Sequence, residues 1–332
     1  MNGSWCTTFR RLAWVSAALG SLIFGLSAPL AAQAQGFPTK PVRLIVPNAP
    51  GGSIDILARL LSQKLQELWG QPVIVDYKPG AGTVLGTDYV AKSAPDGYTL
   101  GMVITGHVIN PSLRSNMPFD TVKDLSGVTM TAISHVVIEA TASLPANSLP
   151  ELIALAKKEP GKISYASPGS GSAMHLAGEL LKSLSGIDIV HVPYKGSGPA
   201  YGDVISGRVQ LMIDPLYASM PYIKAGKMKA LAVTNLTRSA IAPEIPTVAE
   251  TIPGFDVQSI NGIVVPSAAP RELVRKISAD IVKVLQSPDL KARLAELGLQ
   301  TVGNTPEQFD AYIRTEIEKW AKVVKFSGAK AD

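Results

Sequence analysis

Residues 44–55 read Leu-Ile-Val-Pro-Asn-Ala-Pro-Gly-Gly-Ser-Ile-Asp. Residues 44–46 are an aliphatic run typical of a buried strand, and residues 47–52 predict a turn. A helix is expected next, because leucines recur at helical spacing at positions 57, 60, 61, 65 and 68. Its first backbone N–H groups and the positive end of its dipole predict an anion site beside Gly51 and Gly52. A plain strand-to-helix turn explains these two glycines equally well from this segment alone.

The N-terminal segment predicts a cleavable secretory signal peptide over residues 1–34. Arg10 and Arg11 precede an apolar run at residues 12–26, and Ala32-Gln33-Ala34 forms an A-x-A cleavage site. An N-terminal membrane anchor is the alternative, although the run is short for a membrane span. The only cysteine, Cys6, precedes that run, so residues 35–332 contain none. A hydrophobic core rather than disulfides must therefore hold the remaining chain, whose length suits two domains or one large one.

The charge pattern argues against a nucleic-acid partner. The whole chain has a formal net charge of +5, and loss of Arg10 and Arg11 with the signal peptide leaves +3. The lysines and arginines are scattered through the predicted helices instead of gathering in one basic stretch. The balance gives the surface a mild preference for anions.

A second glycine-rich turn, Gly80-Ala81-Gly82-Thr83-Val84-Leu85-Gly86, follows a predicted strand at residues 72–77. Its spacing resembles the fingerprint of a dinucleotide-binding dehydrogenase. That fingerprint also requires an acidic residue about twenty positions later, at the end of the next strand. Here Asp96-Gly97 comes too early, and the strand at residues 98–104 ends in Thr105-Gly106-His107. No nucleotide cofactor is therefore expected.

Beyond residue 141 the pattern alternates between strands and helices. Residues 142–148 are rich in small residues, asparagine and proline, which suits a crossing between domains. The alternation that follows predicts a parallel sheet covered by helices on both faces. The expected strands are residues 163–166, 189–192, 210–213 and 230–234, and the expected helices are residues 173–184, 200–206 and 220–225.

The first of these strands ends in a turn that resembles the one at residues 47–52. It reads Ser167-Pro168-Gly169-Ser170-Gly171-Ser172 and precedes an apolar helical stripe. Ser170 or Ser172 is expected to cap that helix, which leaves the other hydroxyl and the glycine N–H groups for a ligand. Ligands of such sheets lie at the carboxyl ends of strands, so this turn predicts a second anion site.

Three further residues lie at predicted strand ends. Asp214 could orient waters or accept a hydrogen bond from a solute, and capping of the turn at Pro215 is an equally good explanation. His107 and Tyr194 are candidates to line a pocket. His175, on the helix after the second turn, is expected to pack or cap instead of binding a ligand.

The sequence lacks the common catalytic signatures. There is no G-x-S-x-G motif, residues 35–332 contain no thiol, and the four histidines are too dispersed for a local metal motif. We therefore expect no catalytic residue, metal or cofactor. A catalytic triad formed by residues that are far apart in the sequence is an alternative that these motifs do not exclude. Two anion sites without catalytic residues favour binding over catalysis.

Several ordered segments together resemble the extracytoplasmic solute receptors of the tripartite tricarboxylate transporter family, the Bug-type receptors of Gram-negative bacteria. The likeness covers the whole chain after the signal peptide. It departs from the common pattern at Thr83, where a further glycine is frequent, and at Ile260-Asn261, where many members carry a tryptophan. The matching segments are Val46-Pro47, Pro50-Gly51-Gly52 with Asp55, Pro79-Gly80-Ala81-Gly82, Ala94-Pro95-Asp96-Gly97-Tyr98-Thr99-Leu100, Asn110-Pro111, Ser164-Tyr165-Ala166-Ser167, His175-Leu176-Ala177-Gly178-Glu179-Leu180, His191-Val192-Pro193-Tyr194-Lys195-Gly196 and Ile245-Pro246-Thr247.

This resemblance implies an α/β, periplasmic-binding-protein-like (type II) fold, a two-domain Venus flytrap in which each domain is a mixed sheet flanked by helices. Domain 1 would comprise residues 35–141 plus 256–332, and domain 2 residues 142–255. The helix starts after Gly52 and Gly171 would hold one carboxylate, partly through ordered waters. The expected ligand-binding residues are Pro50, Gly51, Gly52, Ser53, Asp55, His107, Ser167, Gly169, Ser170, Gly171, Ser172, Tyr194 and Asp214.

The function that the resemblance implies is that of a periplasmic receptor. It would capture a small di- or tricarboxylate, or an aromatic acid, and deliver it to the integral membrane subunits of a tripartite transporter. A monomer is expected. A secreted hydrolase that acts on an anionic substrate is the alternative from another class, and a ligand-sensing partner of a membrane signalling protein is a third.

Overall fold

The computed structural model describes residues 36–329, so the predicted signal peptide at residues 1–34 lies outside the described residues. Within this part of the chain, no helix combines the length and the apolar character needed to cross a membrane. The residues from Lys40 onward form one compact unit, which holds every strand of the described residues.

The first sheet has six strands in the order β11-β4-β10-β3-β1-β2. β1 lies parallel between β2 and β3, whereas β10 is antiparallel to β3 and β4, and β11 is antiparallel to β4. The predicted strand at residues 44–46 is the end of β1, where Leu44, Ile45 and Val46 are fully buried. The bounds are β1 Val42–Val46, β2 Val73–Tyr77, β3 Thr99–Ile104, β4 Leu125–Ser134, β10 Ser259–Pro266 and β11 Leu299–Thr301.

The second sheet has five strands in the order β7-β6-β8-β5-β9. β6 is parallel to β7 and β8, but β5 lies antiparallel between β8 and β9. A purely parallel sheet, which the alternation of strands and helices predicted, is therefore wrong, and the mixed sheet expected for each domain is confirmed. The bounds are β5 Val136–Thr141, β6 Ser164–Ser167, β7 Val190–Pro193, β8 Leu211–Pro215 and β9 Met228–Val233.

β5 corrects the position of the first crossing between the sheets. Sequence analysis placed residues up to 141 in domain 1, but β5 pairs only with strands of the second sheet. The chain leaves the first sheet at His135, the single residue between β4 and β5. The small residues after position 141 form a turn before a helix instead. We call the elements around the six-stranded sheet the first lobe and those around the five-stranded sheet the second lobe; the division into domains at residues 142 and 256 otherwise stays a prediction.

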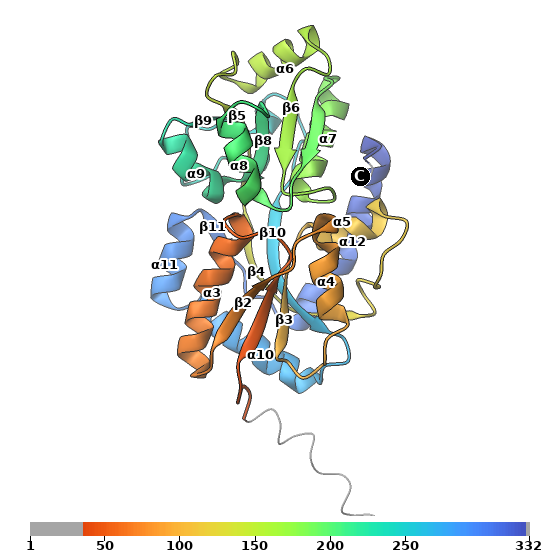
Figure 1. Ribbon diagram of the computed structural model, residues 1–332, viewed down its shortest axis with the longest axis vertical. Coiled ribbons are helices and arrows are strands. Elements are labelled where there is room, and N and C mark those ends of the chain that lie inside the picture. The colour runs from red at the N-terminus through yellow and green to blue at the C-terminus, as the bar shows by residue number, and fades with distance from the viewer. Residues whose placement is uncertain (1–35, 330–332) are drawn as a thin grey trace, which may run out of the picture. The chain divides into compact units, whose positions relative to one another are not determined.

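Helices flank both sheets. In the first lobe, α3 and α11 lie on one side of the sheet and α4 and α12 on the other, so that segments from both ends of the described chain share one lobe (Figure 1). Its helices are α3 Ser53–Trp69, η1 Ala81–Thr83, α4 Val84–Ala91, α5 Gly106–Leu113, α10 Arg271–Leu285, α11 Pro288–Glu296 and α12 Pro306–Ser327. Those of the second lobe are α6 Leu149–Lys158, α7 Ala173–Ser185, α8 Ser197–Ile205, α9 Leu216–Lys224 and η2 Val248–Glu250.

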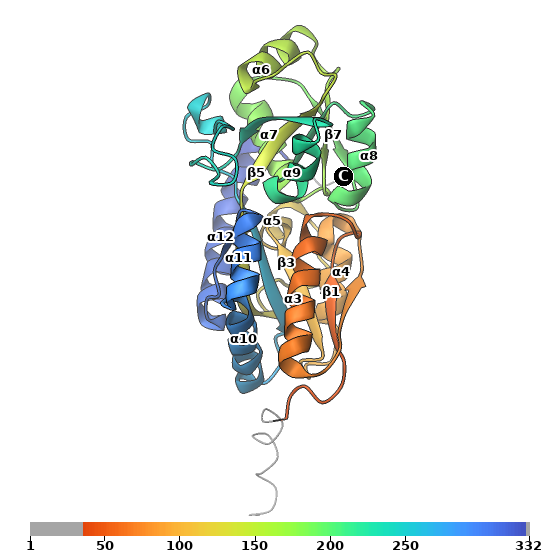
Figure 2. The same cartoon turned by 90° about the vertical axis from the view of Figure 1, so that its left-hand side faces the viewer.

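The two lobes touch where their loops meet. Tyr217 Oη on α9 donates a hydrogen bond to the carbonyl oxygen of Ser53 at the start of α3, at 2.8 Å. The backbone nitrogen of Ala49 donates to the carbonyl oxygen of Lys195, at 2.7 Å. Figures 1 and 2 both place α8 and α9 beside the N-terminal end of α3. The structure is therefore a closed arrangement in which loops of the second lobe cover the start of α3.

Candidate functional site

The turn before α3 is held from within its own lobe by Asp55. The backbone nitrogen of Gly51 donates to Asp55 Oδ2 at 2.8 Å, while Oδ1 of the same carboxylate accepts from Arg59 Nε at 2.8 Å and from Tyr77 Oη at 2.5 Å. A carboxylate in the first turn of a helix is also favoured by the helix dipole. Asp55, which was expected to contact a ligand, is 5 % exposed and shapes this turn.

The start of α3 faces the start of α8. A Cβ atom added at Gly52 would lie 3.2 Å from the backbone nitrogens of both Ser197 and Gly198. On the other side, a Cβ atom added at Gly198 would lie 2.5 Å from the carbonyl oxygen of Pro50, closer than real contacts allow. Only glycine fits this approach of two backbones. Two helix N-termini, from different lobes, therefore converge on one place, and their dipoles together favour an anion there.

Asp214, on β8, holds the start of α8 through hydrogen bonds. Its carboxylate is fully buried and accepts hydrogen bonds from Ser197 Oγ at 2.5 Å and from Tyr201 Oη at 2.7 Å. Burial raises the pKa of Asp214 to about 7, although these two hydrogen bonds oppose the rise. The neighbouring strand carries a second buried acid, Glu139, which accepts from Ser219 Oγ at 2.6 Å and whose pKa burial also raises. Asp214 therefore positions α8, and it is not among the lining residues of the two cavities described next.

A small cavity lies between the two helix starts. Gly52, Ser53 and Ser197 line it together with Asn48 and Asn261, and its volume is about 10 Å³, which suits a single water molecule. Asn48 Oδ1 and Asn261 Nδ2 are buried and have no hydrogen-bond partner among the described residues. Because buried polar atoms are nearly always satisfied, a bridging water or a solute is the expected partner of these two amides.

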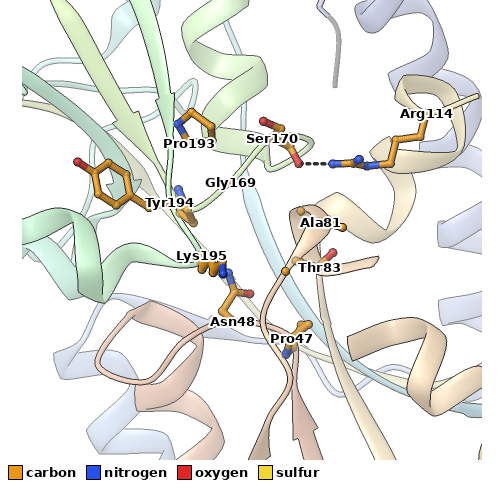
Figure 3. Close-up of a pocket in the computed structure, with 13 residues that line it drawn as sticks. Pro47, Asn48, Ala81, Thr83, Arg114, Gly169, Ser170, Pro193, Tyr194 and Lys195 are labelled. Carbon is orange, nitrogen blue, oxygen red and sulfur yellow. Dashed lines mark hydrogen bonds between the residues drawn. The ribbon is translucent and has the colours of Figure 1, made fainter. Parts of the chain in front are cut away.

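A larger cavity of about 260 Å³ adjoins the small one, since Asn48 and Pro168 line both. Figure 3 shows Arg114 extending from α5 towards Ser170 on the other lobe, where its Nη2 donates to the carbonyl oxygen of Ser170 at 3.3 Å. The volume of this larger cavity lies just below the usual range of pockets for drug-sized ligands, so the cavity suits a smaller solute. The lining residues are Pro47, Asn48, Gly80, Ala81, Gly82, Thr83, Arg114, Pro168, Gly169, Ser170, Pro193, Tyr194 and Lys195.

The turn before α7 uses much of its hydrogen-bonding capacity within itself. The backbone nitrogen of Gly171 donates to His175 Nδ1 at 3.2 Å, and Ser172 Oγ accepts from the backbone nitrogen of His175 at 3.1 Å. Ser172 thus has the capping role that the sequence predicted for one of the two serines, and His175 caps the turn in return. The N–H of Gly171, expected to bind a carboxylate, is already donated to an imidazole.

Ser167 and His191 form a contact that resembles a nucleophile and its base. Ser167 Oγ lies 2.7 Å from His191 Nε2, and the His191 ring stacks on His175 with 4.2 Å between centroids. The serine is fully buried and also accepts from the backbone nitrogen of Gly169, at 3.2 Å. A nucleophile must reach its substrate, so a buried Ser167 fits a structural role in the turn.

His107 and Tyr194 differ in their surroundings. His107 is 4 % exposed, and neither ring nitrogen has a partner among the described residues. Burial lowers the pKa of His107 to about 4, which keeps the ring neutral at neutral pH. Tyr194 lines the larger cavity, and its hydroxyl donates to Asp203 Oδ2 at 2.6 Å. Burial and this carboxylate raise the pKa of Tyr194 to about 12.

The structure thus divides the predicted site residues into four groups. Gly52 and Ser53 line the small cavity, and Gly169, Ser170 and Tyr194 line the larger one. Pro50 and Gly51 form the turn that touches α8, whereas His107 lies apart from both cavities. The internal hydrogen bonds described above involve Asp55, Ser167, Gly171, Ser172 and Asp214.

Sequence reasoning missed several lining residues. Asn48 belongs to the opening segment itself, and Ala81 and Thr83 belong to the glycine-rich turn that was set aside with the nucleotide hypothesis. Both turns follow parallel strands, and ligands of such sheets lie at the carboxyl ends of strands. The sequence position of these turns could therefore have identified their residues as lining residues. Arg114 and Ser197 carried no such signal, because Arg114 follows the end of α5 and Ser197 is the first residue of α8, and only the fold brings these helix ends to the cavities. Among the described residues, no group of histidine, cysteine or acidic side chains could hold a metal ion.

Comparison with known proteins agrees with this arrangement. BugT from Bordetella pertussis is 37 % identical over 309 residues, which cover 92 % of this chain and 94 % of BugT. The solved structure of R. palustris Rpa4515 with adipate has a TM-score of 0.86 at 34 % identity, and the match covers 89 % of this chain and 100 % of that one. MatC (Rpa3494) from Rhodopseudomonas palustris with bound malate has a TM-score of 0.83 at 30 % identity, and the match covers 87 % of this chain and 100 % of MatC.

A family model described as the tripartite tricarboxylate transporter family receptor matches residues 57–328, which is most of the chain. The family resemblance, the two-lobed α/β fold of periplasmic binding proteins and a solute-binding rather than enzymatic role are confirmed together. This chain belongs to the receptors of the tripartite tricarboxylate transporter family.

Proposed function

We propose that this receptor captures a small carboxylate in the larger cavity, with one carboxylate group next to Asn48. The observation that carries the proposal is the convergence of the α3 and α8 N-termini on a one-water cavity that contains two unpartnered amide atoms. A water there would donate to Asn48 Oδ1 and accept from Asn261 Nδ2, and it could connect the solute carboxylate to both helix starts.

The magnitudes suffice for a useful affinity. Each helix N-terminus contributes about 0.3 to 1 kcal/mol, and up to about 2 kcal/mol where partly buried. Each hydrogen bond to a charged group adds about 1.5 to 3 kcal/mol. Micromolar binding corresponds to about 8 kcal/mol, so two helix starts and a few such bonds reach that range. The solved neighbours that contain adipate and malate support a carboxylate as the solute class.

The remaining parts of the proposal follow from the family. The receptor would be exported to the periplasm by the signal peptide at residues 1–34, act as a monomer and hand its solute to the integral membrane subunits of the transporter. The sequence-based site is revised in this proposal. Gly52, Ser53, Gly169, Ser170 and Tyr194 are retained, Asn48, Ser197 and Asn261 are added, and the buried Asp55 and Asp214 act by positioning.

Calorimetry and thermal-shift measurements on the protein from residue 35 onward test the proposal. The panel holds mono-, di- and tricarboxylates and aromatic acids, and we expect at least one to raise the melting temperature, because a ligand that binds only the folded state stabilises it. Asn261→Asp should abolish that shift, since it replaces a donor by a like charge. The same substitution at the exposed Asn147 is the control. A panel in which no acid binds, or an Asn261→Asp protein that binds normally, would contradict the proposal.

A further inference from the structure

The junction of β8 and α9 contacts both helix starts that meet at the small cavity. α9 follows β8 with no loop between them, and the junction carries Asp214 and Tyr217. Asp214 accepts a hydrogen bond from Ser197 at the start of α8, in the same lobe. Tyr217 Oη donates to the carbonyl oxygen of Ser53 at the start of α3, in the other lobe. One short segment of the second lobe is therefore bonded to both sides of this cavity.

Tyr217 is held firmly in its own lobe. Its side chain is buried, and the preceding residue, Leu216, packs in an apolar cluster with Val137 of β5. Ser219 Oγ, in the same helical turn, donates to Glu139 Oε1 at 2.6 Å. Burial also raises the pKa of Tyr217 well above its usual value, so the hydroxyl keeps its proton at neutral pH. Tyr217 therefore presents a fixed hydrogen-bond donor to the first lobe.

The acceptor of this bond belongs to the binding site, whereas the donor does not. Ser53 lines the small cavity, but Tyr217 is not among the residues that line the two cavities. When the lobes separate, the bond breaks and water takes the place of each partner. A contact made only in the closed arrangement shifts the equilibrium towards closure, and the apparent affinity for a solute scales with the fraction of protein that is competent to bind.

We propose that Tyr217 is a positioning residue for solute capture, which holds the start of α3 against the second lobe and raises the affinity for every solute by the same factor. This inference rests on the proposed function, because it requires that the solute binds to the closed arrangement. Selection among acids is left to the residues that line the cavities.

Calorimetry with two acids that the wild-type protein binds unequally tests the uniform effect. Tyr217→Phe removes the hydroxyl and keeps the ring. Both affinities should fall by about twofold to tenfold, the range expected for one neutral hydrogen bond, and their ratio should stay the same. Tyr165→Phe is the matched control, because it removes a buried tyrosine hydroxyl that donates to Glu179 Oε1 within the second lobe, at 2.8 Å. It should leave both affinities unchanged.

Hydrogen exchange at the backbone nitrogen of Ala49 provides a measurement that needs no solute. This N–H donates to the carbonyl oxygen of Lys195 across the lobes, so it exchanges when they open. In the ligand-free Tyr217→Phe protein this amide should exchange about twofold to tenfold faster, by the same hydrogen-bond estimate. In Tyr165→Phe it should exchange at the wild-type rate.

The outcomes separate this inference from the proposed function. If no acid binds the wild-type protein, the proposed function fails, whereas faster exchange at Ala49 in Tyr217→Phe would still support the role in closure. Unchanged exchange at Ala49 would overturn that role, even if the melting temperature falls, because the tyrosine would then only stabilise its own lobe. Weaker binding of one acid alone would also overturn it, since Tyr217 would then contact that solute.

Discussion

The turns at residues 47–52 and 167–172 look alike in sequence and use their polar groups differently. In the first, Asp55 holds the turn from behind, and the start of α3 is left facing the backbone of α8 in the other lobe. In the second, His175 accepts the N–H of Gly171 and donates its own to Ser172. The two turns thus differ in what their helix starts face, although residues from both, Asn48 and Ser170 among them, line the larger cavity.

The partner of the first turn is also not the one that the sequence suggested. The analysis paired the helix start after Gly52 with the one after Gly171, because both follow strands and glycines. The structure instead brings Gly52 so close to α8 that a Cβ atom added there would lie 3.2 Å from the backbone nitrogens of Ser197 and Gly198. The comparison predicts that variants near α8 affect solute capture, whereas a variant at Ser172, whose hydroxyl bonds only within the turn before α7, affects stability.

The largest expected effect is a pH dependence that depends on Asp214. Its folded-state pKa of about 7 lies well above the usual value of 3.8, so the folded state holds this proton more tightly than the unfolded chain. The stabilisation is fully present below about pH 4 and is lost as the pH rises to about 7, a change of roughly 4 kcal/mol over about three pH units. The Asp214→Asn protein has no titratable group at this position, so its free energy of unfolding should not show this fall with pH.

Denaturant unfolding of the wild-type and Asp214→Asn proteins at pH values from 4 to 8 measures this pH dependence of stability. The difference between the two free energies of unfolding is the quantity to plot, since it cancels the opposite contribution of His107, whose lowered pKa makes stability rise with pH between about 4 and 6.5. Burial raises the pKa of Glu139 in both proteins, and the smaller contribution from the Asp214 charge is lost in Asp214→Asn, which adds to the difference in the same direction. Curves that stay parallel over this range would show that Asp214 is ionised throughout in the folded state.

The next effect concerns the approach of the two backbones. Gly198→Ala places a Cβ atom 2.5 Å from the carbonyl oxygen of Pro50, so the closed arrangement should lose about 1 to 3 kcal/mol. Solute affinity, measured by calorimetry, should fall by about tenfold to a hundredfold. Gly202→Ala is the matched control on the same helix, because a Cβ atom there meets nothing within 4 Å. Equal affinities of the two variants would place the solute elsewhere.

The smallest effect tests the turn before α7. Ser172→Ala removes the N-cap of α7 and should cost about 1 kcal/mol of unfolding free energy, with solute affinity unchanged. Ser148→Ala removes the equivalent cap of α6, far from both cavities, and should cost a similar amount. A loss of affinity in Ser172→Ala alone would mean that this turn binds the solute directly, and would remove the difference between the two turns.

Much of the local structure was predictable from the sequence. The strand that ends at Val46, the helix that starts at Ser53 and the capping box of Thr305 and Gln308 are all where the pattern placed them. These features depend on neighbours within a few residues, such as aliphatic runs, glycines and capping side chains. The antiparallel insertion of β5 was not predictable in this way, because strand pairing depends on segments more than 70 residues apart, as in the register of Val137 with Asp214.

The sequence by itself determined the family, the α/β composition and the helix start after Gly52 as one part of an anion site. Only the tertiary structure decided what faces that helix start. Ser197 reaches it because Asp214 on β8 holds the first residue of α8, and Tyr217 on α9 bonds the start of α3. Arg114 likewise meets Ser170 only after the lobes have closed. Such contacts join residues that no local pattern connects, since they result from the packing of two separately formed sheets.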